Sequence, residues 1–140
     1  MSLVDGIKLL ADLSQSEKDN LSLFCQEKLL NAGEVLFYEQ DEASAMYLLK
    51  EGKIEISRMH EGEKIILGDV QAEEILGEMA LFGDSNKRMA TATALEDCIL
   101  VVVLGFSIKD LTKKYPELLE KIKMIINDRM INNKNLNNSK

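Results

Sequence analysis

The sequence contains few of the residues on which common enzyme chemistries depend. Its 140 residues include one histidine, one proline, two cysteines and no tryptophan. A single histidine excludes a metal site built from several histidines, and any Ser–His–Asp chemistry would depend on His60 alone. His60 precedes Glu61 and Gly62, a combination typical of a turn, so we expect its side chain to be solvated. The sequence therefore predicts no enzyme activity.

Cysteine pairs and long apolar segments are also missing. Cys25 and Cys98 lie far apart and neither belongs to a CxxC pair, which argues against a disulfide framework and a thiolate zinc site. The longest strongly apolar run, residues 98–104, is far shorter than the roughly 20 residues needed to span a bilayer. The N-terminal segment carries Asp5 and Lys8 and does not resemble a signal peptide. We expect a cytoplasmic protein without a membrane partner.

Basic residues are in the minority. The chain has 17 Lys and Arg against 24 Asp and Glu, which gives a formal charge of −7. Binding along a nucleic-acid backbone needs a basic stripe, so we expect no nucleic-acid partner. A single small anion can still bind where positive charge is concentrated locally. The apolar content of 46% is normal for a globular protein, and the length allows one domain, predicted over residues 1–131.

Periodicity predicts a mainly β fold with flanking α-helices. Residues 1–27 show apolar residues at helical spacing, with a capping box formed by Ser14 and Glu17. Residues 28–104 contain short strands at intervals of about ten residues, joined by tight turns, which is typical of an antiparallel β-roll or jelly roll. The strands are predicted at 34–38, 46–49, 53–59, 64–70, 89–94 and 98–103.

Residues 105–131 return to a helical pattern. Pro116 suits the first position of a helix, because its missing N–H costs nothing there. The apolar stripe that follows predicts packing, as a C-terminal lid helix on the roll or against a second copy in a homodimer. Asn occupies five of the last ten positions, so residues 132–140 are predicted to be a disordered tail. The stripe consists of Leu118, Leu119, Ile122, Ile125, Ile126 and Met130.

One segment, residues 76–92, has a composition suited to binding an anion. Gly77 allows a ligand to approach the backbone closely, and residues 78–82 can form one helical turn whose N-terminus attracts negative charge. Lys87 and Arg88 then place a double positive charge in a mainly acidic chain. An arginine can bind a phosphate through two parallel hydrogen bonds, and the small residues after Arg88 leave room for a ligand.

This segment resembles the phosphate-binding cassette of the cyclic nucleotide-binding domain family. The family pattern is roughly Gly-Glu-x-(Ala/Ser/Gly)-Leu, a variable loop, and then Arg-(Ala/Ser/Thr)-Ala-(Thr/Ser)-Val. Residues 77–81 are Gly-Glu-Met-Ala-Leu and residues 88–92 are Arg-Met-Ala-Thr-Ala. Glu78 and Arg88 are ten residues apart, a spacing similar to that of bacterial catabolite-activator-type cassettes. Further similarity at residues 10–14, 32–37, 46–55, 95–98 and 115–118 extends the resemblance over most of the chain.

The resemblance implies a role for each cassette residue. It implies that Glu78 accepts a hydrogen bond from the ribose 2′-hydroxyl and that Arg88 pairs with the cyclic phosphate. It also implies that backbone N–H groups around Ala80 and Ala90 complete the anion site. The ligand-binding set implied in this way is Leu67, Leu76, Gly77, Glu78, Met79, Ala80, Arg88, Met89 and Ala90.

The purine is assigned a separate, apolar environment by the same resemblance. Leu67 and Met79 are expected to press on the base, and a side chain of the last helix is expected to cover it. The stripe offers Ile125, Ile126 or Met130 for that covering role. A plainer interpretation stays open for the methionines, since Met79 and Met89 can also serve as core filling.

Four positions depart from the family pattern. Ser44 stands where many members have an aspartate that orients the phosphate-binding arginine. Met89 follows the arginine, where Ala, Ser or Thr is usual; it offers no hydroxyl to a guanine, which favours adenine or an unselective site. Gln40 and Glu73 replace usual glycines, and positive φ angles strain other residues, so we expect these two loops to differ from the family.

The resemblance implies a sensor module of bacterial type. Its expected ligand is 3′,5′-cyclic AMP, with cyclic GMP as the alternative, and its signal is expected to pass through movement of the C-terminal helix. About 20 residues follow Leu119, too few for a winged helix-turn-helix. The output is therefore expected from an unidentified effector protein or a homodimer, unless the chain is a piece of a larger protein. The alternative is a nucleotide-free scaffold in which Glu78 and Arg88 merely form an ion pair.

Overall fold

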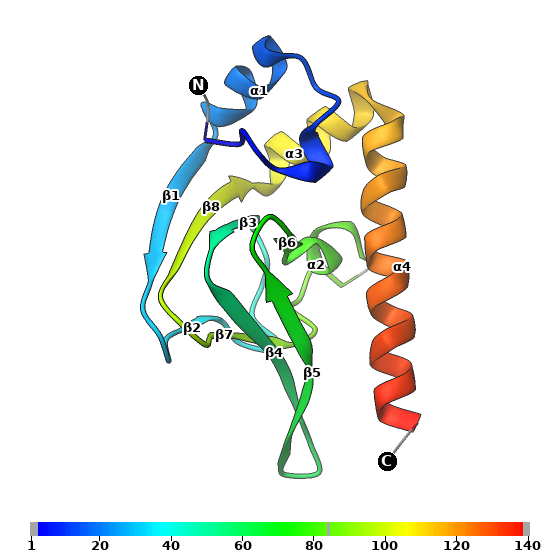
Figure 1. Ribbon diagram of the computed structural model, residues 1–140. Helices are drawn as coiled ribbons and strands as arrows, with labels where there is room; N and C mark the ends of the chain where they lie inside the picture. Colours follow the sequence, from blue (N-terminus) through cyan, green and yellow to red (C-terminus); the bar gives the residue numbers. More distant parts are fainter. Residues whose placement is uncertain (1–2, 84, 139–140) are drawn as a thin grey trace.

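The computed structural model describes residues 3–83 and 85–138, with the side chains of the last helix described as far as Met130. Two four-stranded antiparallel sheets form a β-roll, as periodicity predicts (Figure 1). The first sheet has the order β1 (Cys25–Leu30), β8 (Cys98–Leu104), β3 (Ala45–Glu51) and β6 (Ile75–Leu76). The second has the order β2 (Val35–Phe37), β7 (Thr91–Ala94), β4 (Lys53–His60) and β5 (Glu63–Gln71).

The first sheet is covered on both faces, and its alternating side chains separate two apolar layers. Leu49 pairs with Leu100 and both face the second sheet, where the interior of the roll lies. Leu48 pairs with Val101 and both face outward, beneath the helices. Successive side chains of a strand point to opposite faces, which explains why strands β3 and β8 are almost continuously apolar.

The longest hairpin, β4–β5, projects from the end of the roll (Figure 1). Its turn residues, Glu61 and Gly62, have φ angles of 53° and 82°. Two successive positive φ values give a turn whose twist matches that of the strands, which is why this hairpin is tight. His60 pairs with Glu63 beside the turn and its side chain is exposed, so the predicted solvation of His60 is confirmed.

The N-terminal region differs from the predicted run of helix to residue 27. It contains a short 3₁₀ helix (Lys8–Leu10) and α1 (Gln15–Ser22), which begins with the predicted capping box of Ser14 and Glu17. The predicted extent is wrong at its end, because Cys25–Leu30 forms β1 and pairs with β8 along its whole length. Apolar residues 21, 23, 24 and 29 fit a helical spacing by coincidence; the ladder with β8 determines their conformation.

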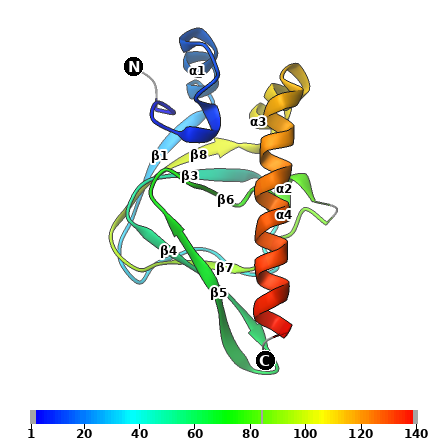
Figure 2. The ribbon, with the colours of Figure 1, turned by 45° about the vertical axis from the view of Figure 1, so that its right-hand side comes forward.

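Two helices complete the chain. They are α3 (Gly105–Lys114) and α4 (Pro116–Asn138), and α4 begins at Pro116 as predicted. Figures 1 and 2 show α4 running along the side of the roll, past α2 (Glu78–Phe82) and towards the β4–β5 hairpin. The structure continues α4 as far as Asn138, into the segment 132–140 that is predicted to be a disordered tail; residues 139 and 140 lie outside the described residues.

The first turns of α4 are fixed by the N-terminal segment. Leu118 and Ile122 belong to the same buried cluster as Val4 and Leu10. Lys121 of α4 also bonds Asp12 at 2.5 Å, and this contact lowers the pKa of the Asp12 carboxyl. Over the described residues, no helix combines the length and apolar character needed to cross a bilayer.

Candidate functional site

A cavity of about 180 Å³ opens between the roll, α2 and α4. It lies where β6 turns into α2 and where the chain re-enters the sheet before β7. All nine residues of the predicted binding set line it. The lining residues that sequence analysis did not assign are Phe37, Ile56, Gly68, Asp69, Val70 and Arg129.

Gly77 gives this cavity its shape. It precedes α2 with a φ of 83°, a left-handed conformation that favours glycine. A Cβ atom at this position would lie 2.7 Å from Nη1 of Arg88. The expected close approach at Gly77 therefore occurs, and here it is the guanidinium group of Arg88 that makes it. The next residue, Glu78, is carried into the interior by the first turn of α2 and is 0% exposed.

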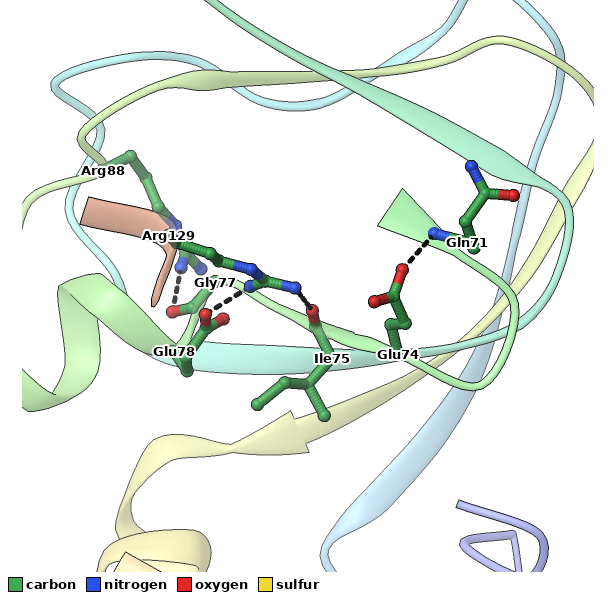
Figure 3. A network of polar contacts seen from close by, with 7 residues as sticks. All are labelled: Gln71, Glu74, Ile75, Gly77, Glu78, Arg88 and Arg129. Atoms are coloured by element: carbon green, nitrogen blue, oxygen red, sulfur yellow. Dashed lines mark hydrogen bonds and ion pairs between the residues drawn. The ribbon is translucent and has the colours of Figure 1, made fainter. Parts of the chain in front are cut away.

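Arg88 is held by backbone carbonyls. Its Nη1 donates to the carbonyl oxygen of Gly77 at 2.9 Å (Figure 3), and its Nη2 donates to that of Ala45 at 2.7 Å. The guanidinium group also lies 4.2 Å from the ring centroid of Phe37, a cation–π contact. Ser44, expected to brace this arginine weakly, is exposed, and the bracing comes from these carbonyls instead. Burial lowers the pKa of Arg88, but an arginine stays charged in proteins.

A second arginine enters the cavity from α4. Nη1 of Arg129 forms an ion pair with Oε1 of Glu78, and Nη2 donates to the carbonyl oxygen of Ile75 at 2.5 Å (Figure 3). Burial raises the pKa of the Glu78 carboxyl, and the positive charge of Arg129 opposes that rise. The ion pair joins the cavity floor directly to the last helix.

Two polar atoms at the centre of the site are left without a partner. Oε2 of Glu78 and Nε of Arg88 are both shielded from solvent, and neither has a hydrogen-bond partner among the described residues. An unpaired buried donor or acceptor costs about 1–3 kcal/mol, more when the group is charged. The site therefore has one free carboxylate acceptor and one free guanidinium donor, and they belong to the two residues that the cassette pattern singles out.

Comparison with known proteins gives this geometry a context. Residues 27–115 match the family model of the cyclic nucleotide-binding domain. The chain belongs to this family. The cyclic AMP receptor protein of Thermus thermophilus is 29% identical over 126 residues, which are 89% of this chain and 58% of the receptor.

Two solved structures carry the same cassette fold. The catabolite activator protein of Thermus thermophilus has a TM-score of 0.75 at 28% identity, covering 94% of this chain and 61% of that one. The regulatory domain of Toxoplasma gondii PKA, solved with cAMP, has a TM-score of 0.67 at 25% identity, covering 73% and 39%. This chain thus spans about three-fifths or less of the length of these relatives.

The last-helix residues expected over the base lie elsewhere. Ile125 and Ile126 pack against the core beneath the helices, and Met130 is half exposed. Within the described part of α4, the cavity is lined by Arg129 instead. The sequence contained a sign of this role of Arg129. Arg129 lies seven residues after Ile122, so it belongs to the apolar face of the helix. A basic residue on an apolar face needs an acidic partner, and the buried cassette glutamate provides it.

The departures from the family pattern affect the cassette less than expected. Gln40 and Glu73 have φ angles of 79° and 77°, so both loops keep the left-handed conformation of a glycine although the residue has changed. The residue change alone has therefore not removed the left-handed conformation at these two positions. Met89 is 52% exposed and stands at the cavity wall, so the core-filling interpretation is wrong for it. It precedes β7, which begins at Thr91 instead of the predicted position 89.

Proposed function

We propose that this domain is a cyclic AMP sensor whose cassette binds the cyclic phosphate and whose α4 helix transmits the signal. The single observation that carries the proposal is the pair of unpartnered atoms, Oε2 of Glu78 and Nε of Arg88. A ribose 2′-hydroxyl can donate to the first, and an equatorial phosphate oxygen can accept from the second. Both buried groups gain the partner they lack when one nucleotide occupies the cavity.

The walls favour adenine in this proposal. Leu67, Val70 and Met79 offer apolar surface to a purine ring. Met89 has no hydroxyl and Gly68 has no side chain, so neither offers a side-chain oxygen to accept from the 2-amino group that distinguishes guanine. The carboxylate of Asp69 is already engaged, since Oδ1 accepts from Gln71 at 2.7 Å and Oδ2 lies 3.6 Å from Lys53. We therefore rank cyclic GMP as the weaker ligand.

The proposed signal passes through one carboxylate. The nucleotide uses Oε2 of Glu78 while Arg129 uses Oε1, so the ligand and α4 act on the same group. Any change in the charge or position of that carboxylate alters the contact that holds the far part of α4. Relatives extend beyond this chain, and a shift of α4 is a suitable output for an effector domain or a partner protein.

One observation favours the nucleotide-free scaffold. Glu78 already has a partner in Arg129, and the cavity of about 180 Å³ is smaller than the roughly 300–1,000 Å³ of most ligand sites. In that case the ion pair is purely structural. The two functions differ in whether any cyclic nucleotide stabilises the fold.

Titration calorimetry and thermal unfolding with cyclic AMP, cyclic GMP and cyclic di-GMP separate the two. A cyclic AMP concentration one hundred times the Kd stabilises the fold by about 2.7 kcal/mol, which raises the Tm by about 10 °C in a domain of this size. We expect this rise with cyclic AMP, a smaller one with cyclic GMP and none with cyclic di-GMP. No heat and no Tm change with any of them at millimolar concentration favours the scaffold.

A further inference from the structure

A second hollow lies away from the cassette, between α1 and α3. Figure 1 shows these two helices at the end of the molecule opposite the tip of the β4–β5 hairpin. It has a volume of about 230 Å³. Leu21 and Phe24 from the α1–β1 side, and Phe106 and Leu111 from α3, provide its apolar lining. We call this hollow the α1–α3 groove.

The groove keeps aromatic side chains at the surface. Phe24 and Phe106 meet edge to face with ring centroids 5.3 Å apart, yet they are 44% and 57% exposed. Leu23, next to Phe24, and Leu104, two residues before Phe106, are exposed as well. Single exposed apolar residues are common, whereas a contiguous patch around a hollow marks an interaction surface. The patch exists because α1 buries Leu21 alone and leaves the adjoining residues uncovered.

The charged residues at the rim of the groove indicate the sign of the charge that a binding partner carries. Glu17 and Asp110 stand on opposite sides of the groove, and Lys114 is the one basic side chain among the described residues that line it. Oε1 of Glu17 accepts from the backbone N–H of Ser14, while its Oε2 is shielded from solvent and has no partner among the described residues. A cationic group can supply that partner, since hydrogen bonds between charged groups are the strong ones.

The net charge of the chain helps to decide between a second copy and a different partner in the groove. Two copies of a chain with a formal charge of −7 repel each other, which disfavours a second copy in this groove. Two helices that flank an apolar groove suit a third helix, and α1 and α3, with 8 and 10 residues, are about 12 and 15 Å long. Two or three turns of a partner helix cover that length.

From these observations we infer that the α1–α3 groove docks a basic amphipathic helix of a partner protein. Large apolar side chains one turn apart lie against Phe24 and Phe106, and a Lys or Arg of the partner bonds Glu17 and Asp110. This surface is independent of the nucleotide site, so it can connect the domain to an effector whatever ligand the cassette takes.

The test uses a displayed library of random 16-residue peptides, selected on the full 140-residue chain and counter-selected on the variant Phe24→Ser/Phe106→Ser. We expect enriched peptides to have a net positive charge and apolar residues at helical spacing. Synthetic copies of them should bind wild type, shift the amide resonances of α1 and α3 and lose affinity as salt is added.

Single variants then assign the binding energy. Phe106→Ser should weaken peptide binding about tenfold, as expected for an aromatic residue at the centre of an interface, and Asp110→Lys should weaken it about fivefold. Leu29→Ser and Glu117→Lys are matched controls, because these residues are exposed and lie outside the groove. Both controls should leave the affinity unchanged. Circular dichroism and Tm establish that each variant is folded.

Four results of the peptide and light-scattering experiments, and a fifth with lipid vesicles, would overturn the inference. The four are the absence of any enriched peptide, enrichment of neutral or acidic peptides, binding that Phe106→Ser does not weaken, and a wild-type dimer in light scattering that Phe106→Ser dissociates. The last result would assign the groove to a second copy. Binding of wild type to phosphatidylcholine vesicles with loss in Phe106→Ser would likewise replace the partner helix by a lipid surface.

Discussion

Two arginines reach the cassette cavity, one from the roll and one from α4, and they are held in different ways. Arg88 donates to the backbone carbonyls of Ala45 in β3 and of Gly77 before α2, lies against Phe37 and is 4% exposed. Arg129 reaches in from a helix, pairs with the side chain of Glu78 and keeps 26% of its own side chain exposed. Arg88 therefore belongs to the roll, whereas Arg129 belongs to α4 and links that helix to the roll through Glu78.

The different ways in which the two arginines are held give them different roles in the proposed function, Arg88 in binding and Arg129 in signalling. A guanidinium group held by carbonyls and an aromatic ring is already oriented for a phosphate, so little ordering is needed when the ligand binds. A guanidinium group whose main partner is an ionisable carboxylate responds to whatever else that carboxylate binds. The first turns of α4 pack against the N-terminal segment, and Ile125 and Ile126 pack against the same core. Any movement is therefore expected mainly beyond Ile126, where Arg129 provides the attachment.

The largest expected effect is on binding, at the fixed arginine. Arg88→Ala should weaken cyclic AMP binding by about 1.5–3 kcal/mol, because a charged hydrogen bond to the phosphate is lost. Calorimetry measures it, and Arg88→Met, which fills more of the buried space, guards against misfolding. Lys87→Ala is the matched control, since Lys87 is adjacent and exposed. Equal affinity in wild type and both Arg88 variants would remove Arg88 from the phosphate site.

The second-largest effect is expected at Glu78, whose carboxylate is shared by the proposed ligand and Arg129. Glu78→Gln should weaken cyclic AMP binding by about 1.5 kcal/mol, because a neutral amide replaces a charged acceptor. In wild type, a rise in pH should strengthen cyclic AMP binding, because it ionises Glu78, but should lower the stability of the fold. Burial raises the pKa of Glu78, so the native state binds more protons than the unfolded state between the unfolded pKa of about 4.3 and the higher native value.

Wild type should therefore lose stability relative to Glu78→Gln as pH rises through that window. Urea unfolding of both proteins from pH 4 to 7.5 measures the difference. Other carboxyls titrate equally in the two proteins and cancel, including Asp12, whose pKa is lowered. A wild-type protein that gains stability relative to the variant as pH rises would show that the ion pair with Arg129 outweighs the cost of burial.

The attached arginine should matter more for α4 than for the roll. Arg129→Ala should lower the free energy of unfolding by about 1 kcal/mol and speed amide hydrogen exchange at residues 123–130. Arg88→Ala should leave exchange in that segment unchanged. Lys123→Ala, an exposed lysine of α4, serves as the control. Unchanged exchange in Arg129→Ala would mean that apolar packing alone holds the helix, and the contrast between the two arginines would fail.

The smallest effect tests the framework itself. Glu73 has a φ of 77°, which strains any residue with a side chain, so Glu73→Gly should stabilise the fold by about 0.5–1 kcal/mol. Gly33 has a φ of 88° with open space around it, and Gly33→Ala should destabilise by a similar amount. Chemical unfolding measures both. A destabilised Glu73→Gly would mean that the Glu73 side chain has a role that outweighs the backbone strain.

Much of the framework follows from local sequence. The strand predicted at residues 53–59, the Glu61–Gly62 turn, the capping box at Ser14 and the start of α4 at Pro116 depend on neighbours in the chain, and each is present. The cassette is similarly local: Gly77, Glu78 and Arg88 lie within twelve residues, so their pattern can be recognised without the fold.

Contacts between residues far apart in the chain could not be predicted from the sequence pattern. Residues 23–29 have helical apolar spacing, but β8, some seventy residues later, draws Cys25–Leu30 into a ladder. The left-handed conformations of Gln40 and Glu73 are imposed by backbone hydrogen bonds to Arg88 and Leu49, since the N–H groups of both residues donate to those carbonyls. Residue preference alone predicted that these loops would change.

The sequence by itself determined a β-roll with a cassette that carries one buried acid and one buried base. Only the tertiary structure decided what holds each of them. The carbonyls of Ala45 in β3 and of Gly77 before α2 orient Arg88, and a residue 51 positions away along the chain pairs with Glu78. Local preference acts through a few neighbouring residues, whereas a buried charge takes whichever partner the packing of α4 brings within reach.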